Sequence, residues 1–153
     1  MRTTATPLAV LRRLAREASR GETPDPLTAM RRLIDRLPLA ALVADDDGHY
    51  VLANAAGSRL TGYSTSELRR RSVWDLTPAA HQRDFEVLWR AFIRQKEQRG
   101  AYEILTKSGR VRKADYAARA HVLPHLHVTV LRPAESRRRK RTARVKRADN
   151  SPS

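Results

Sequence analysis

The chain has 153 residues, which is room for one domain of about 100 residues with terminal segments. It contains no cysteine, which excludes disulfides, Cys-ligated zinc, iron–sulfur clusters and thiol nucleophiles. The formal net charge of +15 bears on anionic partners rather than on the fold, and an excess of arginine over lysine is typical of a GC-rich bacterial genome. No apolar run approaches the ~18 residues of a membrane span, and none is long enough for a secretory signal, so we expect no membrane contact and a cytoplasmic protein.

The N-terminal region, residues 1–33, predicts two amphipathic helices. The residues of a first apolar stripe lie at helical spacing: Leu8, Leu11, Leu14, Ala15 and Ala18. Breaks at Gly21, Pro24 and Pro26 separate it from a second stripe, which continues to Leu37. Because an amphipathic helix needs a partner surface, the first stripe predicts either a homodimer through these helices or a helix that folds back on its own sheet.

The central region, residues 34–133, begins with a hairpin and two short helices. Two apolar runs, 39–44 and 49–53, flank the turn Asp45-Asp46-Asp47-Gly48 and predict a β-hairpin. Asn54 is a typical N-cap for a helix over 55–60, which Gly62 closes. Ser64 and Glu67 then form a capping box that opens a further short helix.

The rest of the central region predicts a longer helix and three strands. The helix is expected to start at Thr77-Pro78, a hydroxyl cap followed by proline, and to end at Gly100. Strands are expected over 102–106, 113–122 and 126–131. Five strands that share sequential hairpins favour one antiparallel sheet with the helices on one face, which is an α+β fold.

Several short motifs in this region resemble those of the PAS domain family. In chain order they are Leu37-Pro38, Asp45-Asp46-Asp47-Gly48, Asn54-Ala55-Ala56, Gly62-Tyr63-Ser64-Thr65-Ser66-Glu67-Leu68 and Lys107-Ser108-Gly109. Each motif is a turn, a cap or a core segment, so together they specify a fold rather than a chemistry. The resemblance implies a PAS-like five-stranded antiparallel sheet over residues 34–133, preceded by the N-terminal helices.

The resemblance also implies a function in signal transduction. PAS domains hold small ligands between the sheet and the helices, or dimerise, and pass a signal to a partner protein. We therefore expect a sensor or adaptor and not an enzyme, and no catalytic residues, since the hydroxyls and carboxylates are explained by caps and turns. A LOV-type photosensor needs a cysteine near Val73, which is absent, and haem relatives place their axial histidine near Phe85. We expect no cofactor.

Eight side chains are candidates for the lining of a ligand pocket, and the same aromatic groups would serve to pack a small core. They are Trp74, His81, Phe85, Leu88, Trp89, Phe92, Tyr102 and Tyr116. Core packing is favoured as the main role of the aromatic residues. His81 is expected to be a partly buried structural histidine at the start of the long helix.

Three histidines, His121, His125 and His127, form a His-x3-His-x-His pattern across the last hairpin. Two strands and a turn could bring them together on a metal ion. The nearest carboxylates in sequence, Asp115 and Glu135, are not obviously placed to complete a ligand set. Coincidence is the favoured interpretation, and no metal site is predicted.

The C-terminal segment, residues 134–153, is a basic tail with eight basic and two acidic residues, a net charge of 8 − 2 = +6. The basic residues are Arg137, Arg138, Arg139, Lys140, Arg141, Arg144, Lys146 and Arg147. The tail has too few apolar groups to offset the entropy of ordering, so we expect it to be disordered by itself. Three interpretations of the tail are open: it is inert, it binds nucleic-acid phosphates, or it binds an acidic protein. A nucleic-acid-associated transcriptional regulator is therefore the alternative function.

Overall fold

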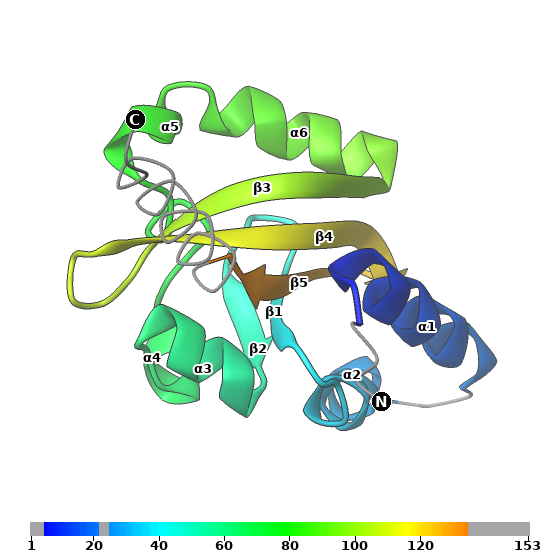
Figure 1. Cartoon of the computed structure of the whole chain (residues 1–153). Coiled ribbons are helices and arrows are strands. Elements are labelled where there is room, and N and C mark those ends of the chain that lie inside the picture. The colour runs from blue at the N-terminus through cyan, green and yellow to red at the C-terminus, as the bar shows by residue number, and fades with distance from the viewer. Residues whose placement is uncertain (1–4, 22–24, 135–153) are drawn as a thin grey trace, which may run out of the picture.

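A five-stranded antiparallel sheet forms the centre of the computed structural model, which describes residues 5–21 and 25–134 (Figure 1). The strands are β1 (Ala40–Ala44), β2 (Tyr50–Ala53), β3 (Glu97–Leu105), β4 (Val111–Leu123) and β5 (Leu126–Pro133). Their order is β2-β1-β5-β4-β3, so the first and last strands are neighbours in the sheet. Antiparallel pairing of β1 with β5, with Ala41 opposite Val130, joins the N-terminal hairpin to the three later strands. The expected α+β fold is confirmed.

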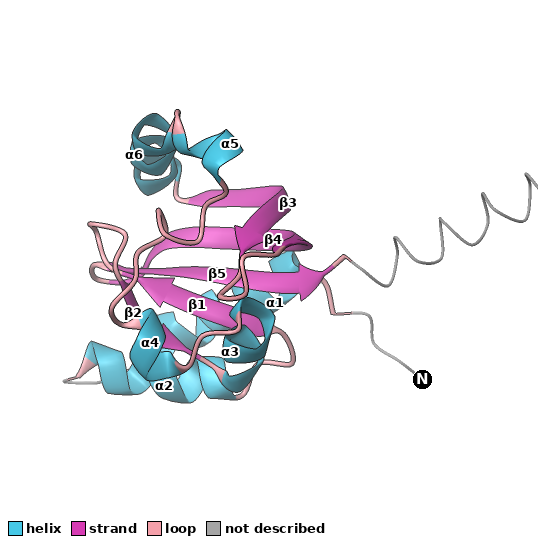
Figure 2. Cartoon of the chain, turned by 90° about the vertical axis from the view of Figure 1, so that its left-hand side faces the viewer, coloured by secondary structure: helices cyan, strands magenta, loops and turns pink. Residues whose placement is uncertain are grey.

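Helices cover both faces of this sheet (Figure 2). They are α1 (Pro7–Arg20), α2 (Pro26–Asp35), α3 (Ala55–Thr61), α4 (Thr65–Leu68), α5 (Ala79–Gln82) and α6 (Phe85–Gln95). Alternate residues of β1 separate the two cores: Val43 packs with α1 and α2 on what we call the outer face, and Leu42 packs with α3 and α4 on the inner face. Within the described residues, no helix is long and apolar enough to cross a membrane.

The apolar stripe of α1 packs on the outer face of its own sheet. Leu11 and Leu14 are fully buried and share a core cluster with Val128 and Val130 of β5. Of the two interpretations open at the level of sequence, the structure shows the helix that folds back. The homodimer stays a prediction, but the uncovered stripe that motivated it does not exist.

The side chain of Asn54 joins the N-terminal helices to the rest of the fold. Its Oδ1 accepts hydrogen bonds from the backbone N–H groups of Ala41 at 3.0 Å and Gly57 at 2.8 Å. Its Nδ2 donates to the backbone carbonyls of Ile34 and Leu39, both at 2.9 Å. Asn54 therefore caps α3, as predicted, and also holds the end of α2 and the start of β1. Gly57 is required at this junction, because a Cβ there would lie 2.8 Å from the carbonyl oxygen of Ala41.

The start of the predicted long helix is wrong. The segment forms two helices, α5 and α6, which are separated by Arg83 and Asp84. Thr77 does not cap the first of them, because its Oγ1 donates to the carbonyl of Val73 at 2.7 Å. Only the short α5 therefore follows Pro78, and the apolar periodicity belongs to α6.

The end of the predicted helix is also wrong, because α6 ends at Gln95 rather than at Gly100. Lys96 follows in a left-handed conformation with a φ of 72°, and the next residues join β3. Residues 97–101 pair with residues 115–119 of β4. This long-range ladder, which local sequence signals do not report, extends the strand backward from its predicted start at Tyr102.

We predict that Asn54→Ala lowers the free energy of unfolding by about 3–4 kcal/mol, because two buried N–H groups lose their acceptor and two carbonyls each lose one donor. Urea unfolding measures this loss. The matched control is Ser66→Ala on the exposed surface of α4, which should change stability by no more than about 0.5 kcal/mol. A loss of less than about 1 kcal/mol for Asn54→Ala would show that water replaces these hydrogen bonds.

Candidate functional site

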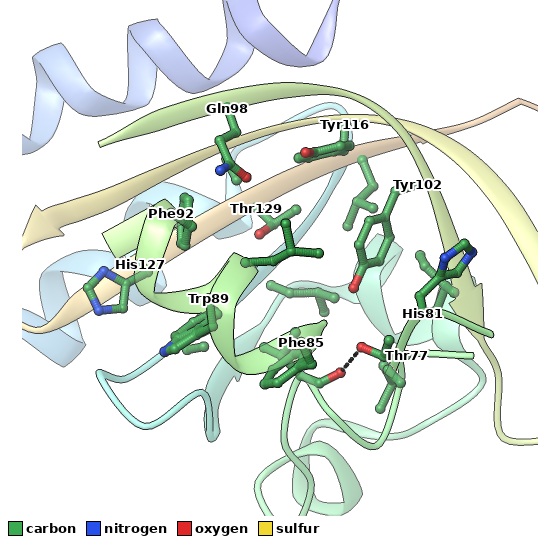
Figure 3. Close-up of a pocket in the computed structure, with 18 of the residues that line it drawn as sticks. Thr77, His81, Phe85, Trp89, Phe92, Gln98, Tyr102, Tyr116, His127 and Thr129 are labelled. Carbon is green, nitrogen blue, oxygen red and sulfur yellow. Dashed lines mark hydrogen bonds between the residues drawn. The ribbon is translucent and has the colours of Figure 1, made fainter. Parts of the chain in front are cut away.

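A cavity of about 160 Å³ lies between the inner face of the sheet and helices α5 and α6 (Figure 3). Seven of the eight predicted candidates line it: His81, Phe85, Leu88, Trp89, Phe92, Tyr102 and Tyr116. The eighth, Trp74, lies outside the lining, is 43% exposed and packs edge-on against Phe85 with ring centroids 5.4 Å apart. The sheet contributes further lining residues from its inner face, among them Tyr50, Gln98 and Thr129.

Helix α6 forms one wall of the cavity with four side chains at helical spacing, Phe85, Leu88, Trp89 and Phe92. Only Phe92 is buried, and Leu88 is 58% exposed although it reaches the lining. The favoured interpretation of these residues as a packed core therefore needs correction. Phe85 and Trp89 of α6 are half-buried between the cavity and the surface.

The opposite wall carries three tyrosines that stay neutral. Tyr102 and Tyr116 lie on neighbouring strands with ring centroids 5.4 Å apart. Burial raises the pKa of both phenols, and it raises the pKa of Tyr50 well above its usual value. Desolvation penalises the phenolate, so the sheet side of the cavity offers uncharged hydroxyls.

His81 is exposed at the rim of the cavity, which corrects the expected partial burial. Its Nε2 lies 3.4 Å from Oε2 of Glu103 on β3. More than half of the His81 side chain is open to solvent, because α5 is short and turns away from the sheet after one turn. His81 therefore belongs to the mouth of the cavity rather than to its interior.

The histidines of the last hairpin gather around Asp46, which comes from the turn between β1 and β2. Oδ1 of Asp46 lies 2.8 Å from Nε2 of His127, and Oδ2 lies 2.5 Å from Nδ1 of His125. The His121 and His127 rings pack edge to face with centroids 4.5 Å apart. The backbone carbonyl of Asp46 also accepts the indole N–H of Trp89 at 2.9 Å. We call these contacts the Asp46 network.

The Asp46 network fits hydrogen bonding better than metal ligation. Ligand atoms of Asp46, His121 and His127 lie within 4.8 Å of one another, which is close enough to consider an ion. However, Nδ1 of His127 accepts the backbone N–H of His121 at 2.9 Å, so the ring proton sits on Nε2 and is donated to Asp46. A metal-bound histidine normally donates through its second nitrogen, and here that nitrogen faces a donor.

The protonation of the Asp46 network follows from its contacts. The hydrogen bond from His125, helped by that from His127, holds the pKa of Asp46 below its usual range. Burial lowers the pKa of His127, although the neighbouring Asp46 partly opposes this shift. Near neutral pH the pair is therefore an aspartate and a neutral histidine, and His127 is also part of the cavity lining.

Sequence reasoning missed Asp46 as the partner of the histidines. In the sequence, the turn alone explains Asp46, and other carboxylates lie nearer to the histidines. A separation of 81 residues divides Asp46 from His127, and only the β1–β5 pairing brings the two hairpin ends together. The eight basic candidates of the C-terminal tail lie outside the described residues.

We predict that acid weakens the fold through His127. Its folded pKa is lowered, so the unfolded chain takes up the proton first as the pH falls through about 6.5, and stability drops. His127→Gln should therefore reduce the loss of stability between about pH 7.5 and about pH 5.5, measured by urea unfolding. The control is Ser66→Ala on the exposed surface of α4, which removes no titratable group and should keep the wild-type dependence. Parallel curves for wild type and His127→Gln would contradict the prediction.

Comparisons with known proteins agree with the fold. A family model described as PAS fold matches residues 34–129. Sporulation kinase E of Bacillus subtilis (strain 168) is 21% identical over 106 residues, which cover 69% of this chain and only 14% of that protein.

Many solved structures are similar to this chain, and two of them illustrate the likeness. A domain of a sensory box sensor histidine kinase/response regulator from Geobacter sulfurreducens has a TM-score of 0.56 and 20% identity, with 69% of this chain and 91% of that chain covered. A PAS domain from Colwellia psychrerythraea has a TM-score of 0.55 and 19% identity, with 71% and 97% covered. These likenesses show the fold, and the family model spans more than half of the sequence. The chain therefore belongs to the PAS fold family.

Proposed function

We propose that this chain is a sensor module that binds a small molecule in the cavity and signals to a partner protein through α6. The observation that carries the proposal is the construction of the cavity wall. One side is the sheet, and the other is a helix of which Phe92 is the only buried residue. A ligand in the cavity would contact this helix directly.

Contacts of Phe92 and Trp89 attach α6 to the rest of the domain. Phe92 packs against Ala118 and Ala120 of β4, and the Trp89 indole donates to the carbonyl of Asp46. On the outward side of α6, Val87 is 70% exposed, and Leu88 at the edge of the cavity wall is 58% exposed. A ligand that binds two positions of α6 with different affinities would shift the population between them, and a partner on this surface would detect the shift.

The size of the cavity supports a small ligand rather than a large prosthetic group. A volume of about 160 Å³ is similar to that of an apolar cavity of ~150 Å³ that holds one benzene. Haem and flavin are several times larger than one ring. This supports the expectation that the domain works without such a cofactor.

Filling the cavity tests the proposal. Ala118 is buried and lines the cavity, so Ala118→Leu places a larger side chain in it. We predict that at least one of toluene, phenol and indole raises the melting temperature of the wild type, and that Ala118→Leu loses this effect. The matched control is Ala80→Leu on the exposed side of α5. The melting temperatures without additive show whether both variants are folded, and no response in the wild type would contradict the proposal.

The alternative function rests on the basic tail. Its eight positive charges, all between Arg137 and Arg147 with no acidic residue among them, favour contact with phosphates rather than with base edges. We propose as a second candidate that the tail gives the domain non-specific affinity for nucleic acid.

We predict that the full chain binds unrelated duplexes equally and that truncation after Pro133 removes this binding. The logarithm of affinity should fall with the logarithm of salt at about −0.9 per neutralised phosphate, which reaches about −7 if all eight residues make contact. Fluorescence anisotropy over a salt series measures this slope. Sequence-selective binding that does not depend on salt, or binding that survives the truncation, would contradict the second candidate.

A further inference from the structure

Among the residues that the structure describes, no permanently charged side chain lines the cavity. Its polar members are hydroxyls, one amide and two histidines, namely Tyr50, Thr77, His81, Gln98, Tyr102, Tyr116, His127 and Thr129. None of the described lining residues is Arg, Lys, Asp or Glu. This distinguishes the cavity from the surface of a chain with 31 basic residues.

Titratable groups do not supply a charge to the cavity either. The raised pKa values of Tyr50, Tyr102 and Tyr116 keep all three phenols protonated near neutral pH. His127 is neutral because burial lowers its pKa, and both of its nitrogens already have partners. His81 stands at the rim, where its Nε2 faces Glu103 rather than the interior.

Three hydroxyls are available for a ligand. Among the contacts of the described residues, no hydrogen bond involves the hydroxyls of Tyr50, Tyr116 or Thr129, and the last two residues lie on the adjacent strands β4 and β5 of the inner face. In contrast, Thr77 donates to Val73. The remaining lining is mostly aromatic and aliphatic, as Figure 3 shows for the residues around Phe85 and Trp89.

From these observations we infer the chemical class of the ligand. The cavity takes an uncharged molecule of about one ring with a polar substituent that faces the hydroxyls of Tyr116 and Thr129. An ion would lose its hydration without finding a counter-ion, so carboxylates, phosphates and ammonium compounds are rejected. This inference rests on the proposed function, since it describes the occupant of the same cavity.

A series of nearly isosteric probes separates charge from shape. Benzamide, benzoate and benzamidinium share one ring and a planar substituent but carry no charge, a negative charge and a positive charge at neutral pH. Isothermal titration with the full chain should show that benzamide binds at least about tenfold more tightly than either ion, because an unpaired buried charge is costly. Ala118→Leu should lose benzamide binding.

A variant that adds a charge to the lining gives a second readout. Gln98 lies on β3 and lines the cavity, so Gln98→Lys should increase the affinity for benzoate relative to benzamide by at least about tenfold. Ser66→Lys adds the same charge on the exposed surface of α4 and should leave the wild-type preference unchanged. The melting temperature of each variant shows whether it is folded.

The outcomes separate this inference from the proposed function. If benzoate or benzamidinium binds the wild type as tightly as benzamide, and Ala118→Leu loses both, the cavity is a binding site but its ligand class is wrong. If toluene binds but neither phenol nor benzamide does, the polar substituent of the inferred ligand class is wrong. If no compound of either series binds, the proposed function itself is overturned.

Discussion

The four hydrogen bonds of the Asn54 side chain are the constraint on which the rest of the architecture depends. They fix the end of α2, the entry to β1 and the start of α3 around one buried amide. Because α2 is held there, α1 and α2 together cover the outer face, while α3 begins on the inner face. A buried amide with all of its donors and acceptors in use stabilises one arrangement and penalises others, since every alternative leaves a polar group unpaired.

At the cavity, the Asp46 network joins separate elements in the way that Asn54 joins them elsewhere. One turn residue accepts hydrogen bonds from both His125 and His127 through its carboxylate, and from Trp89 through its carbonyl. The β1–β2 turn, the β4–β5 hairpin and α6 therefore meet at a single point. Gly48, in a left-handed conformation with a φ of 83°, brings the turn close to the Trp89 ring. A change in the cavity that moves α6 must act on this network, because Trp89 belongs to both.

The two faces of the sheet differ in how completely side chains fill them. The outer face is a dry core of aliphatic side chains closed by α1 and α2, which supports the sheet as a rigid wall. The inner face near α6 is less filled, and its aromatic side chains contact one another around the cavity. A family fold is thus combined with a local lining, and among the described residues of that lining none is Arg, Lys, Asp or Glu.

The sequence by itself determined the class of the fold, the first hairpin, the caps at Asn54 and Ser64, and the residue types of the cavity, because these follow from local propensity and periodicity. Tertiary structure decided the rest. It placed α1 on its own sheet, extended β3 back to Glu97 through pairing with β4, and brought Asp46 to histidines about half the chain away. Each of these outcomes depends on contacts between segments that are distant in sequence. Local sequence signals indicate the conformation that a segment prefers by itself. Which distant segment it packs or pairs with is decided only when the whole sheet forms.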